Sequence, residues 1–279
     1  MYENIKPEIF ATGFKSPEGP SFSRDGKFFF TDWDAGIYQL SVEPGLSPDR
    51  RVVEFLPTGG APTGSKFHRN GYMFVADTGR GEILEILPDK SIRVAASEYQ
   101  GKRFQGPNDL IFASNGDLYF TDPKGSNKDH PVGNVFVLHQ DGNVEWFAGG
   151  LGFPNGIALS DDNRTLYVGE TSFNRIWAFD LDQRGLERSR RLFVHLEGGR
   201  GPDGMVFGED GNLYVAHFLK GVVAVVDPQG RVIGELPTGG VKTTNVAFWE
   251  TTLYVTEVEH SQILRFDLGV RGQTLFGFS

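Results

Sequence analysis

Six polar side chains recur at a regular spacing and are the residues of this sequence best suited to chemistry. Each carries a carboxylate, carboxamide or hydroxyl oxygen, and each lies four residues before an aromatic residue or a leucine. Successive members are 45, 45, 47, 48 and 41 residues apart, and they are Glu18, Thr63, Asn108, Asn155, Asp203 and Thr244. A set of oxygen donors without cysteine or histidine suits Ca²⁺, Mg²⁺ or Mn²⁺.

The charge of this set also favours a cation. Glu18 and Asp203 would repel each other in a narrow pocket, and no lysine or arginine stands at an equivalent position. A divalent cation would balance them, with Asn108 and Asn155 adding neutral oxygens, and would keep coordination positions open for water and substrate. The alternative is that each residue caps a turn, because Pro-acid-Gly and Pro-amide-Gly segments are also good turn formers.

The elements that would position these residues follow from the same repeat. Six short strands end in an acidic or polar residue, at Asp32, Asp77, Asp122, Glu170, His217 and Glu257. A period of 40 to 48 residues with strands in every unit predicts an all-β, six-bladed β-propeller of four-stranded antiparallel blades. The innermost strands of a propeller line its axis, so the six equivalent residues should form a ring there.

The two ends of the chain are expected to meet. Residues 9–19 resemble residues 146–156, which read as an outer strand running into the next inner strand. The N-terminal strand should therefore complete the last blade beside residues 263–268, which closes the ring and hides a strand edge. Residues 1–279 are interpreted as a single domain.

Composition narrows the possible partners. Lys and Arg total 27 against 36 Asp and Glu, a net charge of −9 that disfavours binding to nucleic acid. Without cysteine the chain has neither disulfides nor thiolate metal sites. No apolar run approaches a membrane span, and the first 12 residues lack the apolar centre of a signal peptide. We therefore expect no membrane partner, a cytoplasmic location, and a monomer or weak homo-oligomer.

Other motifs carry less weight. Residues 199–204 satisfy Gly-x-Gly-x-x-Gly, but a proline lies inside the motif and no helical pattern follows. Residues 180–185 begin like a calcium loop, but Arg191 stands where the bidentate glutamate belongs. No Gly-x-Ser-x-Gly segment is present, which argues against a serine hydrolase.

Over nearly its whole length the chain resembles the senescence-marker-protein-30, gluconolactonase and luciferin-regenerating-enzyme family. The motifs that carry the resemblance are Ser16-Pro17-Glu18-Gly19-Pro20, Gly106-Pro107-Asn108-Asp109-Leu110, Phe153-Pro154-Asn155-Gly156-Ile157-Ala158 and Gly201-Pro202-Asp203-Gly204-Met205. The resemblance implies a six-bladed propeller with one divalent metal, often calcium, that hydrolyses lactones and, in some relatives, organophosphate esters.

Carried over residue by residue, the resemblance gives roles to the ring. Glu18, Asn155 and Asp203 match the core metal ligands, and Asn108 matches a position that binds metal in some members and substrate in others. Asp203 also matches the carboxylate suggested as base or nucleophile. The metal would polarise a lactone carbonyl, and Asp203 or a metal-bound water would attack it.

The expected substrate contacts are Asn108, Arg103, Asp122 and His217. Arg103 precedes the Asn108 strand and could reach the substrate, although a solvated loop arginine is the alternative. His217 departs from the family pattern, as does the segment 124–132, so the identity of the lactone stays open. The competing functions are a related organophosphate or ester hydrolase and a non-enzymatic propeller that binds a ligand or protein.

Overall fold

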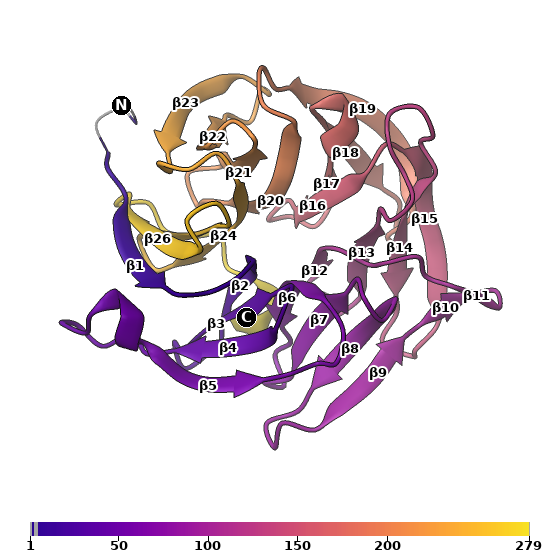
Figure 1. Ribbon diagram of the computed structural model, residues 1–279. Coiled ribbons are helices and arrows are strands. Elements are labelled where there is room, and N and C mark those ends of the chain that lie inside the picture. The colour runs from indigo at the N-terminus through magenta and orange to yellow at the C-terminus, as the bar shows by residue number, and fades with distance from the viewer. Residues whose placement is uncertain (1, 3–4, 279) are drawn as a thin grey trace.

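The computed structural model describes residues 2 and 5–278, and within them the strands form a ring of six four-stranded antiparallel sheets (Figure 1). The predicted six-bladed propeller is confirmed. The described residues also include one two-stranded hairpin, β10 (Glu98–Tyr99) with β11 (Lys102–Arg103), and three 3-10 helices: η1 (Pro48–Arg50), η2 (Thr171–Phe173) and η3 (Phe276–Phe278).

Blades 1 to 5 run outward from the axis in chain order, and the outermost strand of blade 6 is the N-terminal strand. Blade 1 is β2 (Pro17–Phe22), β3 (Phe28–Asp32), β4 (Gly36–Leu40) and β5 (Val52–Leu56); blade 2 is β6 (Pro62–Phe67), β7 (Met73–Asp77), β8 (Glu82–Ile86) and β9 (Ile92–Ala96). Blade 3 is β12 (Leu110–Phe112), β13 (Leu118–Asp122), β14 (Gly133–Leu138) and β15 (Val144–Leu151); blade 4 is β16 (Pro154–Leu159), β17 (Thr165–Glu170), β18 (Arg175–Leu181) and β19 (Glu187–His195). Blade 5 is β20 (Gly201–Phe207), β21 (Leu213–Phe218), β22 (Val222–Val226) and β23 (Val232–Pro237); blade 6 is β24 (Thr243–Trp249), β25 (Thr252–Glu257), β26 (Gln262–Asp267) and β1 (Glu8–Thr12).

Strand β1 closes the ring as expected. It pairs antiparallel with β26, so that Glu8 lies opposite Arg265 and Thr12 opposite Gln262. The Arg265 guanidinium also binds the Glu8 carboxylate at 2.7 Å. The pairing covers the free edge of β26, which would otherwise present unpaired backbone groups to another chain.

Tight hairpins connect the two inner strands of most blades. Gly26, Gly71, Gly116 and Gly211, the second members of Asp-Gly or Asn-Gly pairs, all have φ between 78° and 91°. Glycine adopts this left-handed conformation without a Cβ clash, which is why these pairs favour short turns.

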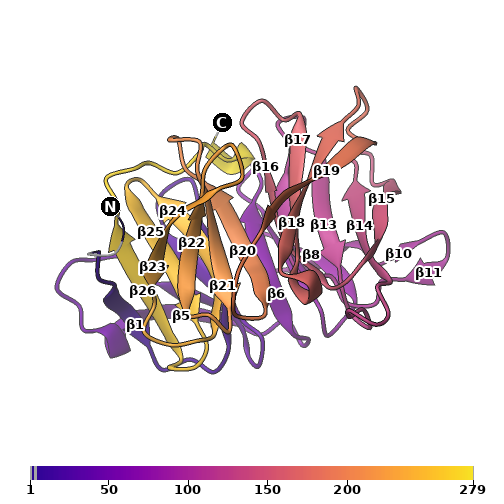
Figure 2. The ribbon, with the colours of Figure 1, turned by 90° about the horizontal axis from the view of Figure 1, so that it is seen from above.

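The hydrophobic core lies between neighbouring sheets. A cluster of buried residues fills the space between blades 3 and 4, including Val135, Leu166 and Phe179. Comparable clusters lie between the other neighbouring blades. In the edge-on view of Figure 2 the sheets stand side by side around the axis and the C-terminal residues lie over one end of the strands. The packing fixes each inner strand relative to the next, which is what a shared axial site requires.

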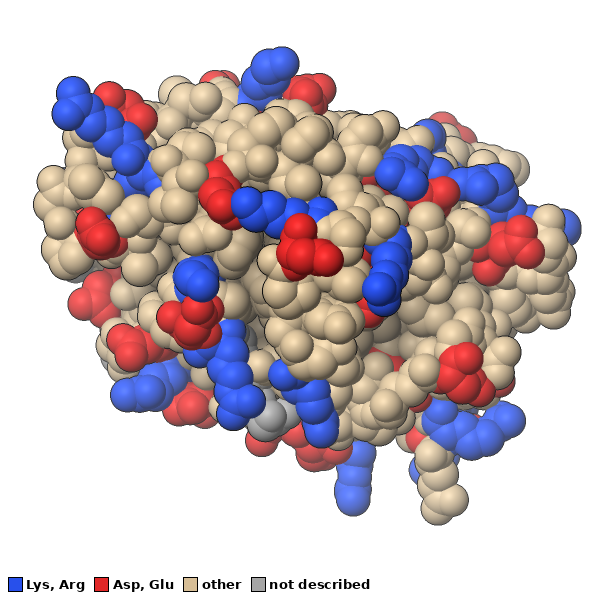
Figure 3. Space-filling model, turned by 90° about the horizontal axis from the view of Figure 1, so that it is seen from below, with Lys and Arg blue, Asp and Glu red and all other residues tan. Residues whose placement is uncertain are grey.

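The surface mixes both signs of charge. On the face drawn in Figure 3, lysine and arginine side chains alternate with aspartate and glutamate side chains among uncharged residues. Among the described residues, no helix has the length and apolar composition needed to cross a bilayer.

Candidate metal centre

The register of the sheets places the predicted ring residues at one level of the axis. Glu18 lies opposite Thr31 on the neighbouring strand, and the Asn108 backbone amide donates to the carbonyl of the equivalent Thr121 at 2.9 Å. The prolines before Asn155 and Asp203 pair with Glu170 and His217, the last or nearly last residues of their strands. The equivalence inferred from the sequence spacing is therefore a structural one.

A recurring backbone irregularity accompanies these positions. The inner-strand register shifts between Glu18 and Ser21 in blade 1, and at the matching position in blades 2, 4, 5 and 6. A bulge of this kind releases a residue from regular pairing and re-aims its side chain. The ring residues are thereby free to point toward the axis.

Glycines after the ring residues let the inner strands approach one another. A Cβ on Gly156 would collide with the Asp203 carbonyl, and one on Gly19 would collide with the Thr63 carbonyl. A Cβ on Gly204 would meet the Asn245 side chain. The ring is thus narrow because its backbone carries hydrogen atoms where other residues would carry side chains.

Two blades have a polar side chain in place of this glycine, and the sequence reasoning missed both. Asp109 follows Asn108, and Asn245 follows Thr244. Asp109 is 1% exposed and Asn245 is 3% exposed. The signal was present in the sequence: four of the six equivalent positions are glycine, and these two are the exceptions.

Three carboxylates consequently share the axial site. Burial raises the pKa of Asp203 well above its usual range, and the charges of Glu18 and Asp109 raise it further. Burial, with a smaller contribution from the charge of Asp109, raises the pKa of Glu18 to about 8. Burial also raises the pKa of Asp109, while the charge of Lys66 opposes the shift. The protein alone does not neutralise this concentration of acid.

One buried hydrogen-bond acceptor of the ring, on Asn155, has no donor within the described chain. Asn155 is 5% exposed, and its Oδ1 atom has no hydrogen-bond partner anywhere in the described residues. Its side chain favours the ionised form of Asp203 through a hydrogen bond. A buried amide oxygen without a donor costs about 1–3 kcal/mol. An orphan oxygen beside Glu18 and Asp203 fits a hard divalent cation.

The remaining ring members behave differently from one another. Asn108 is half-buried, and no hydrogen bond of its side chain is found within the described chain, so its amide remains available. The Thr63 hydroxyl instead donates to the Asn108 carbonyl at 2.6 Å, and the Thr244 hydroxyl bonds to the Pro17 carbonyl at 3.0 Å. Both threonine hydroxyls therefore tie adjacent blades together.

Asp122 is occupied at its own position. Its carboxylate accepts backbone N–H groups from Gln105 at 3.0 Å and Gly106 at 2.7 Å. Both oxygens thus hold the loop that leads into the inner strand of blade 3. In the structure Asp122 has a loop-capping role, and its role as a substrate contact stays a prediction.

Arg103 is likewise directed elsewhere. It lies at the end of the β10–β11 hairpin, its guanidinium binds Glu82 at 3.1 Å, and its side chain is 60% exposed. A second hydrogen bond runs to the Arg80 carbonyl. The structure therefore does not bring Arg103 to the ring, because an acidic partner on blade 2 holds it at the surface.

His217 is buried near the end of β21, where it lies opposite Pro202, the residue before Asp203. It is 1% exposed, and neither ring nitrogen has a hydrogen-bond partner among the residues described. It lines a cavity of about 220 Å³ together with Lys220 and Glu235 of its own blade and His195 of blade 4. Burial lowers the pKa of His217 to about 4, so the imidazole is neutral near pH 7.

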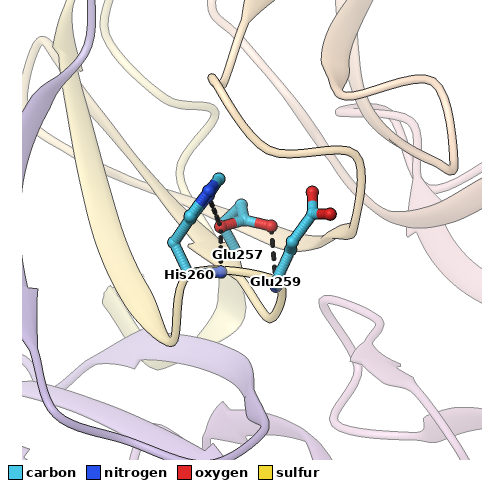
Figure 4. Close-up of side chains that lie close together, drawn as sticks. All are labelled: Glu257, Glu259 and His260. Atoms are coloured by element: carbon cyan, nitrogen blue, oxygen red, sulfur yellow. Dashed lines mark hydrogen bonds and ion pairs between the residues drawn. The ribbon is translucent and has the colours of Figure 1, made fainter.

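A surface group that resembles a metal site is explained by loop capping. Glu257, Glu259 and His260 bring ligand atoms within 4.8 Å of one another. Figure 4 shows the Glu257 carboxylate turned toward the backbone of the other two residues, from which it accepts N–H groups at 2.8 and 2.9 Å. Glu257 is thus the blade 6 counterpart of Asp122.

One end of the axial channel is closed by the C-terminal segment. A cavity of only about 30 Å³ remains there, lined by Lys66, Ile111, Val206 and Val246 and covered by Leu275 and Phe276. A wider cleft of about 730 Å³ lies away from the axis, between blades 1 and 2, and its walls include Phe29, Phe55 and Phe67.

Comparisons with known proteins point to one family. A family model described as "SMP-30/Gluconolactonase/LRE-like region" matches residues 87–259. The gluconolactonase of Zymomonas mobilis is 32% identical over 89% of this chain and 78% of that protein. The diisopropyl-fluorophosphatase of Loligo vulgaris is 28% identical over 90% of this chain and 88% of that protein. The structure of a gluconolactonase from Xanthomonas campestris, 25% identical, superposes with a TM-score of 0.82 over 96% of this chain and 91% of that one.

Proposed function

Since the chain belongs to the SMP-30/gluconolactonase/LRE-like family, we propose that it is a hydrolase that opens sugar lactones with one divalent cation. Glu18, Asn108, Asn155 and Asp203 would hold the cation. The observation that carries the proposal is the buried, partnerless Oδ1 of Asn155, whose side chain hydrogen-bonds to Asp203, a carboxylate of raised pKa. Oxygen-only donors make Ca²⁺ the first candidate, with Mg²⁺, Mn²⁺ and Zn²⁺ as the others.

A cation held by Glu18, Asn108, Asn155 and Asp203 would supply positive charge where negative charge develops on the lactone carbonyl oxygen. Asp203 then acts in one of two ways: it takes a proton from the attacking water, or it attacks the carbon itself. Asn155 orients the Asp203 carboxylate through its side-chain hydrogen bond. In the first route the water oxygen bonds to the acyl carbon as the ring ester bond breaks. In the second, Asp203 bonds to the acyl carbon as the ring ester bond breaks, and water then hydrolyses the resulting acyl-aspartyl anhydride. Both routes end with a protonated ring oxygen and a free carboxylate, which together make a hydroxy acid.

The test is proton release from a panel of aldonolactones in a weakly buffered indicator assay. The protein is first stripped with a chelator and then given Ca²⁺, Mg²⁺, Mn²⁺ or Zn²⁺. Acidification that depends on added metal supports the proposal and names the cation. No acidification with any metal, from folded protein that binds metal, would overturn the lactonase assignment.

A second candidate is the hydrolysis of organophosphate esters. The similarity to the Loligo enzyme, named a diisopropyl-fluorophosphatase, extends over 90% of this chain and favours it. Fluoride release from a fluorophosphate, measured under the same metal conditions, distinguishes the two. A higher kcat/KM for the fluorophosphate than for every lactone would make this the primary activity.

A further inference from the structure

Lys66 is a charged residue in an unexpected place. It is 9% exposed, and it is the one lysine among the buried residues of the described chain. Its Nζ donates to the Ser65 carbonyl at 3.1 Å, and it forms no ion pair with any described carboxylate. A buried ammonium in these surroundings is costly unless nearby negative charge compensates for it.

The surroundings of Lys66 are otherwise apolar. It lines the narrow cavity at the lower end of the channel with Ile111, Val206 and Val246. The equivalent inner-strand positions, each just before the repeated aromatic residue or leucine, are Ser21, Ile111, Ala158, Val206 and Ala247. The charge is therefore specific to blade 2 rather than a feature of the repeat.

The strand that carries Lys66 runs beside Asp109. Gly64 on β6 donates its N–H to the Asn108 carbonyl at 2.7 Å, and a Cβ at Gly64 would collide with the Asp109 carboxylate. The charge of Lys66 lowers the pKa of Asp109, against the larger effect of burial. The charge of Asp109 in turn raises the pKa of both Glu18 and Asp203. These four ionisable groups thus form one electrostatic unit along the axis.

We propose that Lys66 is a built-in counter-charge that sets the net charge of the metal centre and so selects a divalent cation. Glu18, Asp109 and Asp203 contribute −3 when ionised, Lys66 contributes +1, and the sum of −2 matches one divalent ion. Without Lys66 the sum is −3, which favours a trivalent ion. Lys66 is a positioning residue in this scheme, because it acts through Asp109 rather than on the substrate. The inference depends on the metal centre proposed above.

The experiment measures the affinities of Ca²⁺ and Tb³⁺ by calorimetry on chelator-stripped protein. For Lys66→Met we expect the ratio of Tb³⁺ to Ca²⁺ affinity to rise about tenfold or more, because loss of the Lys66 charge leaves the centre one unit more negative. Lys66→Arg keeps the charge and should leave the ratio near that of the wild type. Lys27→Met removes an exposed lysine and is the matched control.

Asp109 supplies the reciprocal arm. Asp109→Asn leaves a sum of −1 and should lower the ratio about tenfold, and Lys66→Met/Asp109→Asn restores −2 and the wild-type ratio. If Lys66→Met does not fold, these two variants still decide the matter. An unchanged ratio in folded Lys66→Met, or in Asp109→Asn, overturns the proposal. Wild-type protein that binds neither ion would instead refute the metal centre itself.

Discussion

Two sets of acidic residues, on the first and second strands of the blades, differ in their hydrogen-bond partners. Carboxylates at the ends of the second strands are filled by backbone donors: Asp32 accepts from Lys15 and Ser16, and Asp122 accepts from Gln105 and Gly106. In the ring set, Glu18 accepts one backbone N–H, from Gly19 at 3.3 Å, but burial and neighbouring carboxylates still raise the pKa values of Glu18 and Asp203.

The difference between the two sets teaches what residue type alone does not reveal. A carboxylate whose oxygens accept N–H groups stabilises a loop, whereas a carboxylate left among acids is a site that needs a cation. The strand-end set recurs as a structural device of the blade, and the ring set breaks the regular pairing. The predictions below test whether stability and catalysis divide along this line.

The largest effect is expected at Asp203. Asp203→Asn should leave the fold intact, because the side chain keeps its size, and should lower kcat by at least about 100-fold, the scale of losing a catalytic acid or base. The assay is lactone hydrolysis with saturating metal, with circular dichroism as the check on folding. Turnover close to that of the wild type would remove Asp203 from the mechanism.

Glu18 should show its role in the metal-free protein. Its pKa is raised to about 8 in the folded state and is near 4.3 when unfolded, so the folded state binds the proton more tightly. The stability it contributes is therefore present below about pH 4 and is lost as the pH rises toward 8. Urea unfolding of chelated protein should show a fall on the order of 2 kcal/mol between pH 5 and pH 8 that is smaller in Glu18→Gln.

Calcium provides the control for this pH dependence. Added calcium should remove most of the fall in the wild type, because the ion replaces the proton as the partner of the carboxylate. A chelated wild type and Glu18→Gln with identical pH profiles would contradict the electrostatic description of the ring.

His217 is the one strand-end residue of the six that is not an acid. Its effect on the pH dependence of stability should be opposite to that of Glu18. Its folded pKa of about 4 lies below the unfolded value near 6.5, so its contribution to stability is present above about pH 6.5 and is lost as the pH falls toward 4. Between pH 7 and pH 4.5 the loss should be on the order of 2 kcal/mol. His217→Gln should flatten this acid limb in urea unfolding.

An exposed histidine serves as the comparison for His217. His130 lies at the surface of the loop after β13, and His130→Gln should leave the acid limb unchanged. An acid limb of equal steepness in the wild type and His217→Gln would show that another group titrates there.

The smallest effect is expected at Asp122. Asp122→Asn replaces a double acceptor with a group that has one acceptor oxygen, so one of the two loop amides loses its partner. We expect a loss of about 1–2 kcal/mol in the free energy of unfolding and little change in kcat. A large loss of kcat without destabilisation would return Asp122 to the substrate site.

Much of the fold followed from spacing, because each blade is a local unit whose turns and inner strands repeat. The blade count, the closure by residues 8–12 and the equivalence of Glu18, Asn155 and Asp203 were all readable in this way. Closure was detectable because the sequence before Glu18 repeats the one before Asn155.

What the sequence concealed depends on contacts between residues that are far apart in the sequence. Whether Asp122 is free or capped is decided by the amides of residues 105 and 106, and whether Arg103 reaches the axis is decided by Glu82. Lys66 was not recognised for the same reason. Only the folded structure shows that it is buried in the axial channel, where its charge affects Asp109. Residue types indicate which chemistry a site could perform. Contacts made in the folded chain decide which side chains remain available for that chemistry.

The most direct test of the metal centre is a calorimetric titration of chelator-stripped protein with Ca²⁺, performed on the wild type and on Glu18→Gln. The account predicts one bound ion per chain in the wild type and an affinity reduced by about tenfold or more in Glu18→Gln, as expected when one of two ring carboxylates is lost. Folded wild-type protein that binds no divalent cation, or an equal affinity in both proteins, would contradict it.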